Sequence, residues 1–317
     1  MAQTTSTSGG ALSERFGVRV LAPVAEALAA GRPIVALESS VFAQGLPIPH
    51  NREAAERMIQ AVVRAGAMPA ITAVVRGVAT LGLDANELDR FLARDGIRKV
   101  AARDLPVAIA QRADGATTVA ASLCIAAAAE VAVFATGGIG GVHRGAPYDE
   151  SGDLAELART PMVVVCAGAK SILDLPATLE RLETLGVTVI GYGTDELPGF
   201  FTRSTGLRLT ARADTASEVA DIHRAARRLG RSQATLVVQP PPSNVALAQD
   251  LVDSAVGTAL GEAQSLGICG AAVTPFLLEA VLRATGGQSL AANLGLLEHN
   301  AALAAQIAVA LAEGVKT

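Results

Sequence analysis

The chain has 317 residues, of which 50% are hydrophobic and 18% charged, and its net charge at pH 7 is −4. This composition supplies a large core and argues against a disordered chain. A slightly negative charge gives no electrostatic footprint for nucleic acid, so we expect no nucleic-acid partner. Cys124, Cys166 and Cys269 are too widely spaced for a metal-ligand pair or a disulfide framework, which indicates a reducing, cytoplasmic environment.

The first residues are rich in Thr, Ser and Gly and have no basic start or apolar run. We therefore predict a disordered tail over residues 1–12 rather than a signal peptide. The most membrane-like stretch is residues 117–135, but Ser122 and Glu130 interrupt it. A buried helix followed by a strand explains this stretch better than a membrane span, so we expect no membrane partner.

Along nearly the whole chain, short apolar runs alternate with amphipathic or Ala-rich segments. The predicted strands are residues 34–37, 70–75, 131–135, 163–166, 187–191 and 235–239. The predicted helices are residues 52–64, 85–94, 117–129, 175–184, 217–229, 244–266, 275–282 and 290–313. This alternation predicts an α/β fold with a largely parallel central sheet, helices on both faces and a helical C-terminal region. Without an internal repeat or a long linker, residues 13–317 are predicted to form a single domain.

In open parallel sheets, ligands bind beyond the carboxyl ends of the strands. Glu38, the pair Arg76-Gly77, Thr136-Gly137-Gly138 and Lys170 each follow a predicted strand closely. A lysine at the mouth of a buried strand is either a cation that reaches out to solvent or a desolvated amine that acts as a nucleophile. The residues alone leave both explanations open, although an acid, an amine and glycines at one edge are the layout expected of an active site.

Two loops carry further candidates. The glycine-dense run 136–145 lacks a dinucleotide fingerprint because His143 stands at its last position, and we interpret it as an active-site loop. Residues 148–153 offer the carboxylates of Asp149, Glu150 and Asp153, which suit Mn²⁺ or Mg²⁺. The residues alone favour the simpler explanation, in which Ser151 and Asp153 cap a helix that begins near Leu154.

The residues near 118 are a candidate phosphate site. Thr117 or Thr118 and the free N–H groups of the following helix could bind a phosphate, or either threonine could be a plain N-cap. Lys99 and Arg103, shortly upstream, could add positive charge to the same phosphate or be solvated.

Assembled, these residues closely resemble the pseudouridine-5′-phosphate glycosidase family, also described as indigoidine-synthase-A-like proteins. The resemblance extends from about Arg32 to Asn300. The matching stretches are ALESS at 36–40, GATTVAA at 115–121, FATGGIGGVHRG at 134–145, LARTP at 157–161, CAGAKSILD at 166–174, IGYGTDE at 190–196, VTPFLL at 273–278 and SLAAN at 289–293.

The resemblance implies reversible cleavage of the C–C glycosidic bond of pseudouridine 5′-phosphate to uracil and ribose 5-phosphate. It implies that Lys170 attacks the ribose C1′ to form an imine-type adduct and that Glu38 gives a proton to the departing uracil carbon. It further implies a homotrimer and a divalent metal, typically Mn²⁺, beside Asp149. The substrate contacts that the resemblance implies are Lys99, Val119, Ser151, Gly152, Asp153 and Asn293. Thr118, the phosphate candidate, is added to this set of predicted substrate-binding residues.

This chemistry suits a C-glycoside, which has no leaving-group oxygen for the paired carboxylates of ordinary glycosidases to protonate. Two features depart from the family pattern. The loop between Gly145 and Asp149 is shorter than usual, and residues 239–243 replace a proline-and-acidic pattern. The alternatives are a Schiff-base lyase acting on another sugar phosphate, cleavage of a related C-nucleoside phosphate, and a non-catalytic sugar-phosphate sensor.

Overall fold

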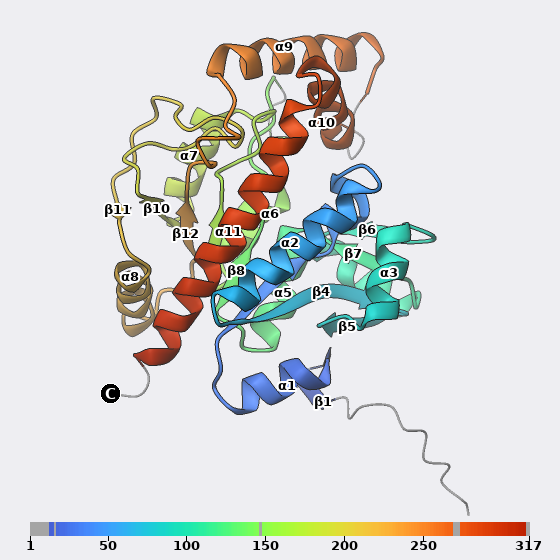
Figure 1. Ribbon diagram of the computed structural model, residues 1–317, viewed down its shortest axis with the longest axis vertical. Helices are drawn as coiled ribbons and strands as arrows, with labels where there is room; N and C mark the ends of the chain where they lie inside the picture. The colour runs from blue at the N-terminus through green and yellow to red at the C-terminus, as the bar shows by residue number, and fades with distance from the viewer. Residues whose placement is uncertain (1–12, 16, 146–147, 269–272, 315–317) are drawn as a thin grey trace, which may run out of the picture.

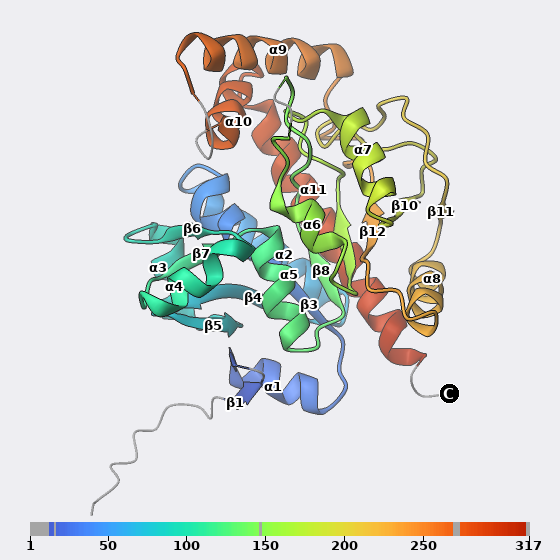
Figure 2. The ribbon, with the colours of Figure 1, turned by 180° about the vertical axis from the view of Figure 1, so that it is seen from behind.

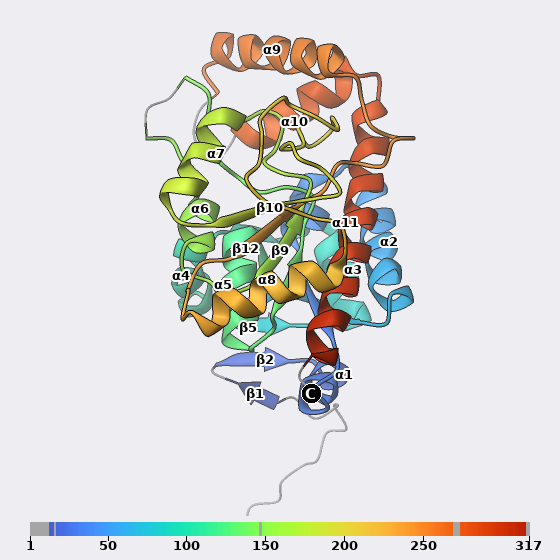
Figure 3. The ribbon, with the colours of Figure 1, turned by 90° about the vertical axis from the view of Figure 1, so that its left-hand side faces the viewer.

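The computed structural model describes residues 13–15, 17–145, 148–268 and 273–314. The tail predicted over residues 1–12 therefore lies outside the described residues, as does Cys269. The described chain is built around one sheet of twelve strands, flanked by helices (Figure 1). Figure 3 shows β1 and β2 at one end of the molecule and α9 and α10 at the other.

The central part of the sheet is parallel. Its order is β4-β3-β8-β9-β12-β10-β11, and each neighbouring pair in this run is parallel. The strands are β1 (Ser13–Arg15), β2 (Val18–Val20), β3 (Ile34–Glu38), β4 (Met68–Val75), β5 (Val78–Leu81), β6 (Arg98–Val100), β7 (Gly115–Thr117), β8 (Val133–Ala135), β9 (Val163–Cys166), β10 (Thr188–Tyr192), β11 (Arg212–Ala213) and β12 (Thr235–Val238). Every residue of β3, β8, β9 and β12 is buried, as expected for strands covered on both faces.

Helices cover both faces of this sheet. The helices are α1 (Ala22–Ala29), α2 (His50–Arg64), α3 (Ala85–Ala93), α4 (Leu105–Ala110), α5 (Val119–Ala128), α6 (Gly152–Leu157), α7 (Leu175–Thr184), α8 (Ala216–Arg228), α9 (Gln249–Ser265), α10 (Val273–Ala284) and α11 (Gln288–Glu313), with a short π-helix η1 (Val41–Gly45) and a 3₁₀ turn η2 (Ala102–Asp104). Helices α2 and α11 lie on one face (Figure 1), and α5, α6 and α7 lie on the other (Figure 2). The predicted fold class is confirmed.

The region around β4 is where the sequence prediction was incomplete. Val75 pairs with Val78, so Arg76 and Gly77 form a two-residue hairpin turn, and both have positive φ angles of 50° and 80°. That geometry is typical of the turn that joins antiparallel strands. Glu38 pairs with Thr72, so β4 runs past the end of β3 before it turns back into β5, and neither Arg76 nor Gly77 lines the cavity at the strand ends. The prediction that Arg76-Gly77 lies with the other strand-end residues at the site was therefore wrong.

Two predicted helix starts were also too early. Helix α5 begins at Val119, not Thr117, because residues 115–117 form β7 and pair with β4 and β6. Helix α9 begins at Gln249, not Asn244, because a turn follows the three prolines at 240–242. Residues 117–135 otherwise form the buried helix and strand that were predicted in place of a membrane span.

Among the described helices, α11 is the one long and apolar enough to cross a membrane. However, 56% of its most apolar 18-residue window is buried inside the protein, where the helix packs against α2, β8 and β9. The core helix of a globular protein has the same properties, so length and composition give no reason to place α11 in a membrane.

One buried side chain of α11 fixes the ends of two strands. Asn300 is 1% exposed, and its Nδ2 donates to the carbonyls of Thr136 (2.8 Å) and Gly137 (3.3 Å). Its Oδ1 accepts from Nε2 of Gln239, at 2.9 Å, just after β12. Asn300 thereby holds the glycine-rich loop after β8 against the helix.

We expect Asn300→Leu to lower the free energy of unfolding by about 2–3 kcal/mol, because it leaves buried partners unpaired. Urea denaturation measures this change. Gln306→Leu, at an exposed position of the same helix, is the matched control and is expected to change stability by less than about 0.5 kcal/mol. Equal stability of Asn300→Leu and the parent would contradict the role given to Asn300.

Candidate active site

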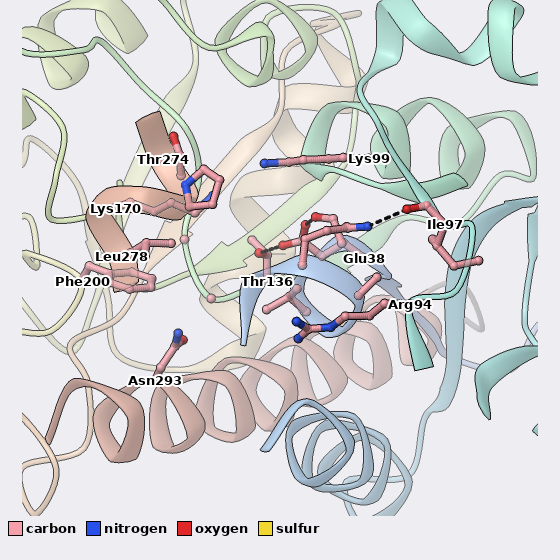
Figure 4. Close-up of a pocket in the computed structure, with 18 residues that line it drawn as sticks. Glu38, Arg94, Ile97, Lys99, Thr136, Lys170, Phe200, Thr274, Leu278 and Asn293 are labelled. Carbon is pink, nitrogen blue, oxygen red and sulfur yellow. Dashed lines mark hydrogen bonds between the residues drawn. The ribbon is translucent and has the colours of Figure 1, made fainter. Parts of the chain in front are cut away.

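A cavity of about 450 Å³ opens at the carboxyl ends of β3, β8 and β9 (Figure 4). Its lining residues come from the strand ends, from η1, from the α3–β6 region and from α10 and α11. They are Glu38, Ser40, Val41, Ala43, Gln44, Gly45, Arg94, Ile97, Lys99, Thr136, Gly137, Gly138, Lys170, Phe200, Thr274, Pro275, Leu278 and Asn293. Of the predicted site residues, four line this cavity: Glu38, Lys99, Lys170 and Asn293.

Glu38 is the last residue of β3, and its side chain is held by two hydroxyl groups. Glu38 is only 5% exposed, and Ser40 Oγ donates to its Oε2 at 2.6 Å. Thr136 Oγ1 donates to the other oxygen, Oε1. This bond follows from the register, because Leu37 pairs with Ala135 and the next residue of each strand lies alongside. The carboxyl group is therefore buried, oriented and placed at the cavity surface.

Lys170 reaches the same cavity from the turn after β9. Gly168 has a φ of 89°, and a Cβ there would lie 2.6 Å from the carbonyl oxygen of Pro198, so only glycine fits this turn. The Lys170 N–H then donates to the carbonyl of Ile139 at 3.1 Å. The Lys170 side chain is half-buried and points into the cavity, as Figure 4 shows. Lys170 is therefore part of the cavity lining, and its role as a nucleophile stays a prediction.

Cys166, at the end of β9, is the described thiol nearest to Lys170 along the chain. Burial raises the pKa of its thiol to about 12, so the group stays protonated near neutral pH. Its side chain is fully buried. Cys166 is therefore a core residue and is not part of the cavity lining.

Lys99 brings a second amine to the cavity. Lys99 is an exposed residue and lines the cavity, yet the surrounding protein partly desolvates its ammonium group. This desolvation lowers the pKa of Lys99, and the charge of Lys170 lowers it further, whereas Glu38 and Asp153 act in the opposite direction. Lys170, Glu38 and Asp153 therefore lie close enough to Lys99 to act on its charge.

Asp153 does not line the cavity, but its carboxylate binds two segments of the chain beside it. It is 6% exposed, its Oδ1 accepts from the Ala120 N–H at 3.0 Å, and its Oδ2 accepts from the Gly140 N–H at 2.8 Å. One carboxylate thus joins the start of α5 to the glycine-rich loop. Gly140 must be glycine, because a Cβ there would lie 2.2 Å from Ser151 Oγ.

The predicted cap is confirmed for Ser151 and wrong for Asp153. Ser151 is the N-cap of α6, and its hydroxyl accepts from the Asp153 N–H at 3.2 Å, so the helix begins at Gly152 rather than Leu154. Asp153 lies inside α6, and its carboxylate binds other backbone groups. Thr118 is the N-cap of α5, but its side chain makes no capping bond, and its Oγ1 is buried without a hydrogen-bond partner. Thr118, Val119, Ser151, Gly152 and Asp153 do not line the cavity. Their predicted substrate contacts stay predictions.

The metal prediction finds little support in the side chains. Asp149 is exposed and does not line the cavity, and its carbonyl accepts from the His143 N–H at 2.9 Å. Glu150 is paired with Arg181 Nε at 2.8 Å. Within the described ranges, no group of three or more His, Cys, Asp and Glu side chains could hold a metal ion. The described donors therefore do not fit a site made of protein ligands alone, and we derive no chemical step through a metal.

Sequence reasoning missed Gln44 and Arg94, which both line the cavity. Gln44 lies on the π-helix η1, and Arg94 ends α3 with a left-handed φ of 67°. Neither follows a buried strand, so the strand-end rule did not find them. The sequence could have indicated Gln44, because it lies only six residues after Glu38. Six residues are too few to lead the chain far from the end of β3.

Comparisons with known proteins identify the relatives of this chain. A family described as indigoidine synthase A like protein matches residues 23–310. The chain is 64% identical over 304 residues to a pseudouridine-5′-phosphate glycosidase of Gemmatimonas aurantiaca, covering 96% of this chain and 99% of the relative. It is 50% identical to a pseudouridine-5′-phosphate glycosidase of Herpetosiphon aurantiacus, covering 93% of this chain and 99% of the relative.

Two solved structures share the fold. The prealnumycin C-glycosynthase AlnA, in complex with ribulose 5-phosphate, is 38% identical with a TM-score of 0.88, covering 94% of this chain and 98% of that one. An indigoidine synthase A-like protein from Thermotoga maritima is 35% identical with a TM-score of 0.84, covering 89% and 94%. The fold and the cavity define an α/β protein with a strand-end pocket. The chain belongs to the indigoidine synthase A like family.

The coupling between the two lysines gives a prediction. Lys170→Met removes a like charge, so the pKa of Lys99 is expected to rise; Glu38→Gln removes an opposite charge, so the pKa of Lys99 is expected to fall. An NMR titration of ¹³C-methylated lysines measures both shifts. If the Lys99 signal titrated identically in all three proteins, these charges would not share one cavity.

Proposed function

We propose that this protein cleaves the C–C glycosidic bond of pseudouridine 5′-phosphate to give uracil and ribose 5-phosphate, and that the reaction is reversible. The observation that carries the proposal is the convergence of Lys170, Glu38 and Lys99 on one cavity, in a chain 64% identical to a relative with that name. AlnA, a C-glycosynthase, binds a pentose phosphate in a related fold, which supports the same substrate class here.

In the proposed reaction, the neutral amine of Lys170 attacks C1′ and displaces the ring oxygen, and the attacking nitrogen gives up a proton to that oxygen as the sugar opens. The nitrogen lone pair then forms a C=N bond to C1′ while the bond from C1′ to uracil C5 breaks. The electrons of that bond go to C5, which receives a proton from Glu38. Water hydrolyses the protonated imine, releasing ribose 5-phosphate, restoring the Lys170 amine and returning a proton to Glu38.

The surroundings of both groups suit these roles. The hydroxyls of Ser40 and Thr136 hold the Glu38 carboxyl group in one orientation, so its proton has a fixed direction of transfer. Lys99 supplies positive charge beside Lys170 and suits an anionic group such as the 5′-phosphate. Thr118, at the start of α5, and Asp153, which orders that start, complete the proposed phosphate side of the site.

The proposal is tested by incubating the protein with pseudouridine 5′-phosphate and following uracil release. We expect Lys170→Met to lower kcat to the detection limit and Glu38→Gln to lower it roughly 10²- to 10⁴-fold, the usual share of a general acid. Gln264→Leu on the exposed side of α9 is expected to keep full activity. A folded parent protein that releases no uracil would refute the proposal, and cleavage of another C-nucleoside phosphate instead would redirect it.

Three expectations from the sequence remain proposals. They are the cytoplasmic location expected from the cysteines, and the homotrimer and the divalent metal, Mn²⁺, beside Asp149 that the family resemblance implies. If Asp149 holds the metal, Asp149→Ala should weaken Mn²⁺ binding at least about tenfold, because one carboxylate of a mainly hydrated site is lost. Calorimetric titration with Mn²⁺ measures this without relying on activity. Unchanged Mn²⁺ affinity would place the metal elsewhere. Light scattering of the purified protein reports the oligomeric state.

A further inference from the structure

A second cavity of about 390 Å³ adjoins the first, and the two share part of their lining. The shared residues are Gln44, Gly45, Arg94, Pro275, Leu278 and Asn293. They form the wall between the two spaces. Three of them are polar, and we call Gln44, Arg94 and Asn293 the polar wall.

Each member of the polar wall has a buried polar atom without a hydrogen-bond partner. These atoms are Gln44 Oε1, Arg94 Nε and Asn293 Oδ1. They are three of the nine such side-chain atoms in the described part of the chain, and all three residues line both cavities. Buried polar atoms are costly to leave unpaired, so their clustering beside the reactive groups indicates a ligand that completes them.

The neighbouring contacts fix what two of these side chains offer. Gln44 Nε2 donates to the carbonyl of Ile97 at 3.3 Å, which orients the amide and leaves Oε1 as an acceptor. Arg94 donates to the carbonyl of Leu46 through Nη2, and burial lowers the pKa of its guanidinium, which nevertheless stays charged. With Asn293 Oδ1, the polar wall offers two acceptors and one cationic donor.

The place of the polar wall suits the base rather than the sugar phosphate. In Figure 4, Lys99 lies on one side of Glu38, and Arg94 and Asn293 lie on the other. If the phosphate binds near Lys99 and Glu38 gives its proton to C5 of the base, the opposite edge of the base extends toward Arg94 and Asn293. Uracil joined through C5 keeps N1–H and N3–H on that edge, with the C2 carbonyl between them. A uracil joined through N1 keeps only N3–H.

Two donors flanking one acceptor on the base match two acceptors and one donor on the protein. We propose that Gln44 and Arg94, together with Asn293, are specificity-determining residues that recognise the N1–H, C2=O and N3–H edge of the base. The polar wall thereby selects C5-linked over N1-linked nucleotides. This inference rests on the proposed function, because it assumes that a uracil base occupies the cavity.

The test compares pseudouridine 5′-phosphate with its N1-methyl and N3-methyl derivatives, each of which lacks one donor. The parent enzyme is expected to prefer the unmethylated substrate at least about 100-fold in kcat/KM, because a methylated base leaves an acceptor unpaired. Gln44→Ala removes one acceptor and makes room for the methyl group. It is expected to reduce the preference over one of the two derivatives to less than about tenfold and to leave the other preference intact.

Arg94→Met is expected to lower kcat/KM for all three substrates alike, roughly 10- to 100-fold, because each keeps the C2 carbonyl. Gln264→Ala on the exposed face of α9 is the matched control and should change neither activity nor preference. If Gln44→Ala lowered all three activities by one factor, or if the parent cleaved both methylated substrates as fast as the unmethylated one, the assignment of the polar wall would be overturned.

A separate measurement distinguishes this failure from failure of the proposed function. Ribose 5-phosphate has no base, so borohydride should trap its adduct equally in the parent, Gln44→Ala and Arg94→Met. Trapping in all three shows that the variants are folded and that the sugar site is intact. Absence of the adduct and of uracil release in the parent would refute the proposed function itself.

Discussion

The structure depends on holding a carboxyl group inside the end of a parallel sheet. Glu38 is almost fully buried, and the hydroxyls of Ser40 and Thr136 occupy one oxygen each. Burying a carboxylate is costly unless hydrogen bonds replace the lost water. Thr136 can serve only because β8 lies beside β3 in this register, and Asn300 in turn binds the carbonyl of Thr136. The core packing and the site are thus parts of one network.

Two glycines make the rest of the arrangement possible. Gly168 lets the chain turn sharply after β9 so that Lys170 enters the cavity, and Gly140 lets the glycine-rich loop approach Ser151 and Asp153 closely. Neither position has space for a Cβ, so the glycines serve backbone proximity rather than flexibility. The Asp153 carboxylate then binds both that loop and the start of α5. It lies near enough to Lys99 to act on the charge of that side chain.

Much of this followed from the sequence, because a parallel sheet brings strand ends together whatever their spacing along the chain. That rule placed Glu38, Gly137 and Lys170 at one edge, and the structure agrees. It failed at Arg76-Gly77, where a local hairpin reverses the chain, and it could not find Gln44 or Arg94. Those two reach the cavity through a π-helix and a left-handed helix end, which depend on tertiary packing rather than on a periodic pattern.

The central claim is that Lys170, and not its neighbour Lys99, carries the sugar during the reaction. The most direct measurement is peptide mapping by mass spectrometry after the protein is reduced with borohydride in the presence of ribose 5-phosphate. The account predicts that the peptide containing Lys170 gains the mass of one reduced pentose phosphate and that the peptide containing Lys99 is unmodified. A label on Lys99, or an unlabelled protein that still releases uracil, would contradict it.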